Sequence, residues 1–382
     1  MSAERAGAAQ AQVRRLVVKI GSSTLTNAAG QLDASYLNDL AAQARQLVDE
    51  QVELLIVSSG AIIAGLEALA MPPKRPDDVP TLQAAAAVGQ IELARHYAQS
   101  FELQELRLAQ ILLTRADIQN RQSYLHARDT LYRLLNLGVI PLINENDTVA
   151  IDEIRFGDND SLAAQVAMMV KADLVVLLSD IEGLYSADPR LEADAELLEQ
   201  VAIFSAEIVD AAGEAGTEKG SGGMFTKIEA ARMLKAASIP TVICSGRVTN
   251  ALLSAARGEV RGTRFLTDGD RRQAGARKLW LALAGPIQGA VKVDAGAARA
   301  LRERGGSLLA VGVREVQGEF APGSALDIRN PEGLLIGRGL SSYSSAVLRS
   351  AAGLTSTRLT DAKLLNDQDT AIVIHRDEMV VF

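Results

Sequence analysis

Residues 16–23 have the sequence LVVKIGSS, and this stretch decides the fold class of the chain. Its apolar part, Leu16–Ile20, is too short for a helix and is typical of a strand buried on both faces. The lysine near the end of this run is followed by a glycine and two hydroxyl side chains. This pattern suits an anion, because backbone N–H groups can approach it closely and lysine supplies a positive charge. An ordinary turn after a strand with a chance lysine is the alternative.

Four more short apolar runs follow further along the chain, with stretches of helical periodicity between them. Strands that alternate with helices predict βαβ units around a mainly parallel sheet that is covered on both faces. Ligands of such sheets bind beyond the carboxyl ends of the strands, where polar residues follow nearly every run. The predicted strands are Leu16–Ile20, Leu54–Val57, Val139–Ile143, Leu174–Leu178 and Thr241–Cys244, and the predicted helices are Tyr36–Val48, Leu82–Phe101, Ser123–Leu137, Leu162–Val170 and Thr226–Ala237.

The sequence pattern changes after Thr267. A charged segment, Asp268–Lys278, leads to short β-like segments with frequent glycines, which predict a small β-rich domain. These segments are Val291–Val293, Ser307–Val313, Ala325–Ile328, Leu334–Ile336 and Ala371–His375. We therefore expect a disordered tail at residues 1–13, an α/β domain at 14–266, a linker at 267–286 and a β-rich domain at 287–382.

The composition of the 382 residues excludes several classes of protein. The single cysteine, Cys244, rules out a disulfide framework, and the three histidines show no metal-ligand spacing. The net charge of −8 falls entirely on residues 1–278 and argues against a protein that coats nucleic acid or an anionic membrane. No apolar run is long enough to span a membrane, and Met1–Gln12 lacks the apolar stretch of a signal peptide, so we expect a cytoplasmic protein.

Further polar segments follow predicted strands or precede predicted helices. Each has a structural explanation: a helix cap at Ser58–Ala61, a polar turn at Asn144–Asp147, a cap from Asp160 or Ser161 within Gly157–Ser161, and a flexible linker at Lys219–Lys227. Each also suits a ligand, since N–H groups at a helix start hold anions and carboxylate or amide groups hold Mg²⁺ or an amino group. The glycine-rich segment is not a Walker A loop, because it lacks the GxxxxGK[ST] spacing.

The combination of these segments is more informative than any one of them. Two lysines near glycine-containing loops, Lys19 and Lys227, together with acidic or amide groups beyond parallel strands, indicate phosphoryl transfer. Positive charge at such a site would neutralise the phosphoryl oxygens as the bond breaks. We expect Cys244 to pack inside its strand as a small apolar residue, with no catalytic role.

Eight motifs, in order along the chain, closely resemble those of the glutamate 5-kinases, also called γ-glutamyl kinases, within the amino-acid kinase family. The resemblance covers about residues 14–380 and implies an amino-acid kinase αβα sandwich with a mainly parallel central sheet, followed by a small β-rich PUA domain. The PUA-like segments are Arg304–Val313, Asp327-Ile328, Gly337–Gly339 and Tyr343-Ser344. The kinase motifs are VVKIGSS (Val17–Ser23), IVSSGAI (Ile56–Ile62), LLTRAD (Leu112–Asp117), ARDTL (Ala127–Leu131), INEND (Ile143–Asp147), GDND (Gly157–Asp160), GLYSADPR (Gly183–Arg190) and GGMFTK (Gly222–Lys227).

This resemblance implies ATP-dependent phosphorylation of the side-chain carboxylate of L-glutamate to L-glutamyl 5-phosphate, the first step of proline biosynthesis, with Mg²⁺ as cofactor. A carboxylate nucleophile is already ionised at pH 7 and needs no general base, which agrees with the lack of a placed histidine. The resemblance also implies feedback inhibition by L-proline and a homo-oligomer, either a dimer or a tetramer. A nucleic acid or membrane partner is not expected.

The family motifs also imply roles for individual residues. Lys19 and Lys227 would neutralise the transferring phosphoryl group, with help from the N–H groups of Gly21 and Gly60. Asp160 would hold both lysines by charge pairing, and no protein ligand for a metal is assigned. Glutamate-binding positions match Ser59, Asp147 and Asn159, and Asp147 suits the α-ammonium group by charge. ATP-binding positions match Lys19, Ser179, Asp180, Ser221, Gly222, Gly223, Met224, Phe225, Thr226 and Lys227.

Departures from the family pattern are small and remove no charged group: they are Phe225, Ser179 and Ala310. Acetylglutamate kinase, aspartokinase and uridylate kinase are the nearest alternatives, and the C-terminal domain and the INEND and GDND motifs favour glutamate 5-kinase over them. An RNA-binding protein is a second alternative, because PUA domains elsewhere bind RNA, but residues 279–382 carry no net charge. A pseudo-kinase scaffold is a third, which the intact Lys19, Asp160 and Lys227 disfavour.

Overall fold

A computed structural model describes residues 13–72, 76–149, 159–189, 192, 194–204, 208, 223–267, 287–361 and 371–381. The described residues form two compact units, and the first ends along the chain at Leu266. Most of the predicted tail and linker lies outside the described residues, as do two of the predicted ATP-binding residues, Ser221 and Gly222.

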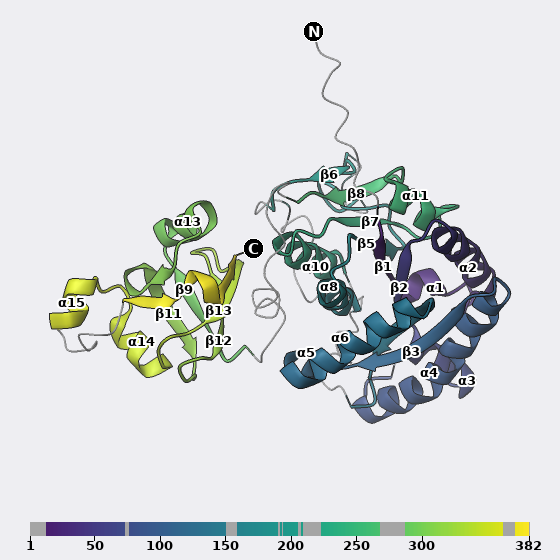
Figure 1. Ribbon diagram of the computed structural model, residues 1–382, viewed down its shortest axis with the longest axis horizontal. Helices are drawn as coiled ribbons and strands as arrows, with labels where there is room; N and C mark the ends of the chain where they lie inside the picture. The colour runs from purple at the N-terminus through teal and green to yellow at the C-terminus, as the bar shows by residue number, and fades with distance from the viewer. Residues whose placement is uncertain are drawn as a thin grey trace, which may run out of the picture. The chain divides into compact units, whose positions relative to one another are not determined.

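The first unit is built around an eight-stranded sheet with the strand order β3-β4-β2-β1-β5-β7-β8-β6 (Figure 1). All neighbouring pairs are parallel except β7 and β8, which confirms the predicted mainly parallel sheet. The five predicted strands all form. The bounds are β1 Arg15–Ile20, β2 Glu53–Ser58, β3 Arg107–Leu113, β4 Val139–Glu145, β5 Leu174–Ser179, β6 Gln200–Val201, β7 Thr241–Ser245 and β8 Gly262–Phe265.

All five predicted helices are present, with ends that differ from the prediction by no more than a few residues. Several of the helices begin at well-formed caps: the Asp33 and Asp78 carboxylates accept hydrogen bonds from the N–H groups of Tyr36 and Thr81. The bounds are α1 Ser22–Leu25, α2 Ala34–Asp49, α3 Ala61–Ala68, α4 Val79–Glu102, α5 Arg115–Gln119, α6 Arg121–Asn136, α8 Asn159–Val170, α10 Met224–Ala236 and α11 Ala251–Arg257.

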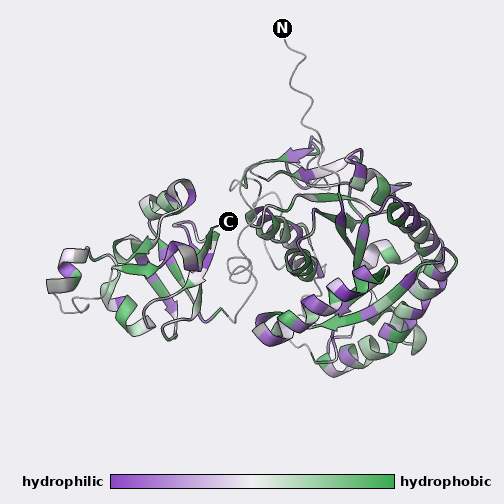
Figure 2. Cartoon of the chain, viewed as in Figure 1, coloured by the Kyte–Doolittle hydropathy of each residue, from purple (hydrophilic) through white to green (hydrophobic). Residues whose placement is uncertain are grey.

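The two faces of the sheet are covered by different helices, and the alternation of strand side chains decides which residue meets which helix. In β1, Leu16, Val18 and Ile20 join the apolar cluster formed with α2, α4 and α11. Val17 and Lys19 therefore point to the opposite face, where α8 packs against β1 and where the start of α10 contacts the start of α8. The strands are apolar along most of their length, whereas the outer helices alternate polar and apolar residues (Figure 2). Lys19 is thus directed towards α8.

Helices α3 and α4 pack at backbone distance. A Cβ atom at Gly65 would overlap the carbonyl oxygen of Ala85, and one at Gly89 would overlap that of Ala61. The two glycines thus allow the helices to touch without intervening side chains. Helix α3 follows Gly60, whose φ of +98° lies in the left-handed region that favours glycine.

The second unit confirms the predicted small β-rich domain. It contains a five-stranded sheet with the order β11-β9-β12-β13-β15 and a two-stranded sheet, β10-β14, around an apolar core. The β-like segment Ser307–Val313 is not one continuous strand. Strand β10 ends at Leu309 and a short 3₁₀ turn, Ala310–Gly312, follows, because the chain changes its pairing partner from β14 to β9. The bounds are β9 Gly289–Val293, α13 Ala295–Arg304, β10 Leu308–Leu309, β11 Val313–Gly318, β12 Ala325–Arg329, β13 Leu335–Leu340, α14 Ser345–Ala351, α15 Ser356–Asp361, β14 Ile372–Ile374 and β15 Met379–Val381.

Candidate active site

A buried cluster of three charged side chains lies beyond the carboxyl end of β1. Asp160 is in the first turn of α8, and its Oδ1 lies 2.6 Å from Lys19 Nζ. Its other oxygen, Oδ2, lies 3.1 Å from Lys227 Nζ, in the first turn of α10. The Asp160 side chain is 0% exposed and the two lysines are only 4% and 6% exposed. One carboxylate therefore positions two lysines that come from distant parts of the sequence.

The cluster carries an excess of one positive charge in a region with little water. Removing one partner of a buried ion pair leaves the other charge uncompensated, so the three groups depend on one another. Thr226 adds a third contact, because its hydroxyl donates to Asp160 Oδ2 at 3.0 Å. The start of α8 also favours a negative charge at Asp160 through the helix dipole. This net positive charge suits the binding of an anion at the carboxyl ends of the strands.

The alternative explanation of Asp160 or Ser161 as a helix cap was wrong. Helix α8 already begins at Asn159, so both residues lie within the helix, and the Asp160 carboxylate is directed towards the lysines. The cap predicted at Ser58 or Ser59 was also wrong, because the residue before α3 is Gly60 and no side chain caps that helix. Ser58 instead ends β2, where its hydroxyl lies 3.0 Å from the buried Tyr97 hydroxyl.

The two predicted glycine N–H groups differ in their surroundings. The N–H of Gly21 donates to the carbonyl of Leu178 at 3.3 Å, which ties the end of β1 to β5. This bond engages the N–H group that the family motif assigns to the phosphoryl oxygens, and the role of Gly21 stays a prediction. Gly21 precedes the short helix α1, which the sequence did not predict. Gly60 lies in the wall of a small pocket, and its role stays a prediction.

This pocket brings together all three predicted glutamate-binding residues. Its volume is about 80 Å³, and it lies between the end of β4, the turn before α3 and the start of α8. Asn144 and Glu145 also line it, although the sequence suggested a turn there. Both residues belong to β4 and are buried, because the strand continues two residues past its apolar run. The lining residues are Ser22, Ser59, Gly60, Ala61, Ile62, Ile63, Asn144, Glu145, Asp147 and Asn159.

Asn159 holds the wall of the pocket together through its side-chain amide. Its Nδ2 lies 2.8 Å from the carbonyl oxygen of Ser58, 3.2 Å from Ser59 Oγ and 2.7 Å from Asn144 Oδ1. These three acceptors take up both hydrogens of the amide nitrogen. Asn159 therefore joins β2, the Ser59 turn and β4 in this structure.

Apart from Lys19, the described ATP-binding candidates lie at the carboxyl end of β5 and at the start of α10. Ser179 is buried and donates to Asp180 Oδ1 at 3.1 Å, whereas Asp180 is exposed. Gly223 is exposed at the start of α10, and Met224, Phe225 and Thr226 are half-buried beside Lys227. Their roles towards ATP stay predictions.

Arg247 belongs to no motif that sequence analysis could single out. It follows β7, forms an ion pair with Asp33 at 2.8 Å, donates to the carbonyl oxygens of Ser23 and Thr26, and lies over the Tyr36 ring. Its hydrogen bond to Asp33 holds the pKa of that carboxyl below its usual value. Arg247 thereby fastens the end of α1 to the start of α2.

Cys244 is buried in β7, as predicted. Burial raises the pKa of its thiol to about 12. The protonated form therefore dominates at neutral pH, which argues against a nucleophilic role.

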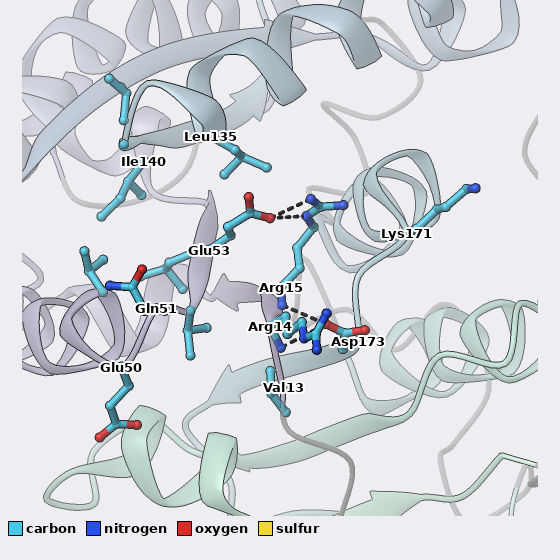
Figure 3. A pocket seen from close by; sticks show the side chains of 15 residues that line it. Val13, Arg14, Arg15, Glu50, Gln51, Glu53, Leu135, Ile140, Lys171 and Asp173 are labelled. Carbon is cyan, nitrogen blue, oxygen red and sulfur yellow. Dashed lines mark hydrogen bonds and ion pairs between the residues drawn. The ribbon is translucent and has the colours of Figure 1, made fainter.

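A larger hollow, of about 720 Å³, is lined by residues at the amino ends of β1, β2 and β4 (Figure 3). It thus lies at the opposite edge of the sheet from the cluster of Lys19, Asp160 and Lys227. Its charged groups largely engage one another. Arg15 pairs with Glu53, and the Asp173 carboxylate accepts hydrogen bonds from the backbone N–H groups of Arg14 and Arg15. Because ligands of parallel sheets bind beyond the carboxyl ends of the strands, we place the active site at the lysine cluster despite its smaller pocket.

The described residues were also searched for a metal site and for a membrane-spanning helix. Across the described ranges, no three His, Cys, Asp or Glu side chains gather as a potential metal site. No helix in the described parts of the chain is long and apolar enough to cross a membrane.

Comparison with known proteins supplies independent information. The model of the amino acid kinase family matches residues 14–245, and that of the PUA domain matches residues 289–361. The glutamate 5-kinase of Geobacter sp. (strain M21) is 43% identical over 370 residues, which span 97% of this chain and 98% of that protein. The glutamate 5-kinase of Nitrosospira multiformis is 46% identical over 370 residues, with the same two coverages of 97% and 98%. The solved structure of UMP kinase from Bacillus anthracis has a TM-score of 0.48 and 16% identity, and the match covers 67% of this chain and 97% of that one.

Proposed function

We infer that this chain, which belongs to the amino acid kinase family and within it to the glutamate 5-kinases, transfers a phosphoryl group from ATP to the side-chain carboxylate of L-glutamate. The product is L-glutamyl 5-phosphate, which opens proline biosynthesis. The structural observation that carries this function is the buried Lys19–Asp160–Lys227 cluster beyond the carboxyl end of the central sheet.

The cluster answers the main difficulty of the reaction, which is the approach of two anions. The glutamate carboxylate is ionised at pH 7 and needs no base to remove a proton. The energetic cost lies in bringing it to the negatively charged γ-phosphoryl group. Lys19 and Lys227 would offset this repulsion and the charge that develops as the phosphoryl group moves, and Asp160 would keep both ammonium groups in place. Local charge is essential here, because residues 1–278 carry the whole net charge of −8.

The small pocket beside the cluster would bind the substrate amino acid. Ser59 and Asp147 line it, and the negative charge of Asp147 suits the α-ammonium group. ATP would lie on the other side of the lysines, against Ser179, Asp180 and the start of α10. This arrangement would place the acceptor carboxylate and the γ-phosphoryl group on either side of the Lys19 and Lys227 ammonium groups.

Mg²⁺ would enter with ATP and be held mainly by phosphate oxygens and water. This type of binding is usual for Mg²⁺, which keeps several waters and takes few protein ligands. The chain fits it, because the described residues offer no cluster of acidic side chains and both Asp160 oxygens already face lysines. The ion would supply further charge neutralisation at the phosphate oxygens.

We also propose that L-proline, the end product, inhibits the enzyme, that the enzyme works as a homo-oligomer, and that it acts in the cytoplasm. Proline carries an α-carboxylate and a cationic nitrogen, the two groups that the pocket would recognise in glutamate. Glutamate saturation curves at increasing proline concentration test this point, and light scattering measures the oligomeric state. Glutamate saturation curves in which proline changes neither the KM nor the maximal rate would contradict feedback inhibition.

The proposed activity is tested by coupled ADP release with four acceptors: L-glutamate, N-acetylglutamate, L-aspartate and UMP. We expect ADP release with glutamate alone. Hydroxylamine traps acyl phosphates as hydroxamates, so a glutamate-dependent hydroxamate would show that a carboxylate is phosphorylated. Turnover of aspartate or UMP without turnover of glutamate would overturn the proposal.

A further inference from the structure

We propose that Asn144 is the group that binds the α-carboxylate of the substrate, and that Asn159 acts as the positioning residue for its amide. This assignment rests on the proposed function of the site. It starts from one observation: the Nδ2 atom of Asn144 is buried and has no hydrogen-bond partner among the residues that the structure describes, although Asn144 lines the small pocket. Asn144 is only 5% exposed. A buried polar group without a partner is costly, and a ligand is one of the explanations it calls for.

The orientation of the Asn144 amide is fixed by two backbone groups. The Ser58 carbonyl oxygen can only accept, so the Asn159 atom at 2.8 Å from it must be the donor Nδ2. The Asn144 atom at 2.7 Å from that nitrogen must then be an acceptor, its Oδ1. The backbone N–H of Glu145, which can only donate, meets the same Oδ1 at 2.9 Å. Both constraints leave Nδ2 as the unpartnered end of the Asn144 amide.

The same network removes Asn159 as a donor to the substrate. Its Nδ2 faces three protein acceptors, so no hydrogen of that group is left for a ligand. Its contribution to binding is indirect, because it holds the Ser59 hydroxyl and the Asn144 amide in place. The predicted glutamate ligand Asn159 and the unpredicted Asn144 thus exchange roles.

The position of Asn144 selects the α-carboxylate over the side-chain carboxylate. The acceptor carboxylate must reach the lysine cluster, but the described lining of the pocket includes neither Lys19 nor Lys227. The pocket therefore holds the amino-acid end of the substrate. Asp147 offers a negative charge for the ammonium group there, and an N–H donor is the complementary group for the carboxylate.

Two substitutions at one position separate this role from a structural one. Asn144→Asp has nearly the same shape and retains an acceptor for Glu145 N–H and Asn159 Nδ2, but it turns a carboxylate oxygen towards the substrate. Asn144→Ala removes both functions. We expect Asn144→Ala to raise the glutamate KM by about 10-fold or more, and Asn144→Asp by about 100-fold, because a charge-assisted hydrogen bond is replaced by repulsion. The KM for ATP should stay within about twofold of wild type, since this role concerns the glutamate pocket alone.

A matched control adds the same charge elsewhere, by Asn38→Asp on the exposed face of α2. This variant should leave both KM values unchanged. If Asn144→Asp binds glutamate like wild type while Asn144→Ala is impaired, the amide is structural and the proposal is overturned. Turnover of glutamate by the wild-type enzyme is measured in the same series and reports separately on the proposed function.

Substrate fragments identify the group that Asn144 contacts. Glutarate keeps both carboxylates but lacks the ammonium group, whereas 4-aminobutyrate lacks the α-carboxylate. Calorimetric titration with a non-hydrolysable ATP analogue present should show that Asn144→Ala weakens glutarate and leaves 4-aminobutyrate unchanged, and that Asp147→Ala does the reverse. Equal weakening of both fragments by Asn144→Ala would overturn the assignment to the α-carboxylate.

Discussion

The ammonium nitrogen of Lys19 lies 2.6 Å from Asp160 Oδ1, and the aspartate side chain is completely shielded from solvent. Lys19 is the last residue but one of the buried strand β1, and Asp160 is the second residue of α8, the helix on the sheet face that this lysine points to. The second oxygen of the same carboxylate meets Lys227. The carboxylate of Asp160 therefore holds both lysine ammonium groups in place, a role that requires no contact between Asp160 and either substrate.

Replacement of Lys227 by alanine should reduce turnover by at least about 10²-fold, because it removes positive charge that stabilises the transition state. Steady-state kinetics with saturating ATP and glutamate measure the effect. Lys171→Ala is the matched control, since Lys171 is exposed at the opposite edge of the sheet. Turnover of Lys227→Ala close to that of the control would refute the role of this lysine.

Asp160→Asn should destabilise the protein, because it keeps the shape of the side chain but leaves two buried ammonium groups without a negative partner. Breaking a buried pair in this way costs about 3–5 kcal/mol of unfolding free energy. Urea denaturation followed by circular dichroism measures the loss. Asp49→Asn breaks the exposed pair with Arg45 on α2 and should cost less than about 1 kcal/mol. Similar losses for the two variants would contradict the importance of the buried cluster.

The Cys244 thiol should be unreactive in the folded protein. Burial raises its pKa to about 12, so almost no thiolate exists at pH 8, and the side chain is inaccessible. Titration with a disulfide reagent should detect less than one thiol in native protein over the time of the assay and the full single thiol in denaturant. Rapid native labelling would show that β7 opens or that the thiol lies elsewhere.

The ion pair between Asp33 and Arg247 should give a stability contribution that depends on pH. The folded-state pKa of Asp33 lies below its ordinary value of about 3.9, so its contribution is present above that pH and is lost as the pH falls through the folded-state value. Asp33→Asn tests this, because asparagine keeps the cap of α2 but not the charge. The melting temperature of this variant should be lower than that of wild type at pH 7, and the difference should shrink below about pH 4. A difference that is constant from pH 7 to pH 3 would show that charge is not its cause.

The sequence was sufficient for the five central strands and their helices, because each strand is a short apolar run buried on both faces. Strand β3 was missed because it lies at the edge of the sheet and carries Arg107 and Gln110 within Arg107–Leu113, which breaks the apolar run. The end of β4 was placed too early for a related reason. Asn144 and Glu145 are polar, yet they continue the strand because they still pair with Leu112 and Leu113 of β3. Asn144 Oδ1 also accepts hydrogen bonds from Asn159 Nδ2 and from the N–H of Glu145.

The residues of the candidate site that belong to family motifs could be predicted from the sequence. The contacts between residues that are far apart in the sequence could not. The motifs pointed to Lys19, Asp160 and Lys227, and the structure shows that they meet. Three long-range contacts have no local sequence pattern. The Gly21 N–H donates to the Leu178 carbonyl oxygen, and the Asn159 amide donates to the Ser58 carbonyl oxygen and to Asn144 Oδ1. Arg247 donates to the carbonyl oxygen of Thr26, directly after α1. Each of these contacts joins residues from separate elements, so only the folded chain reveals them.

The backbone contact between α3 and α4 has a consequence for how this enzyme can change over time. Residues 60–63, at the start of α3, form one wall of the substrate pocket, and Gly65 and Gly89 let α4 press directly against that helix. A single added methyl group at either glycine would push the wall inward or tilt it. Gly65 and Gly89 do not line the pocket, yet their lack of a side chain sets the distance between α3 and α4. We therefore expect substitutions at these two glycines to be tolerated as poorly as substitutions at the residues that line the pocket.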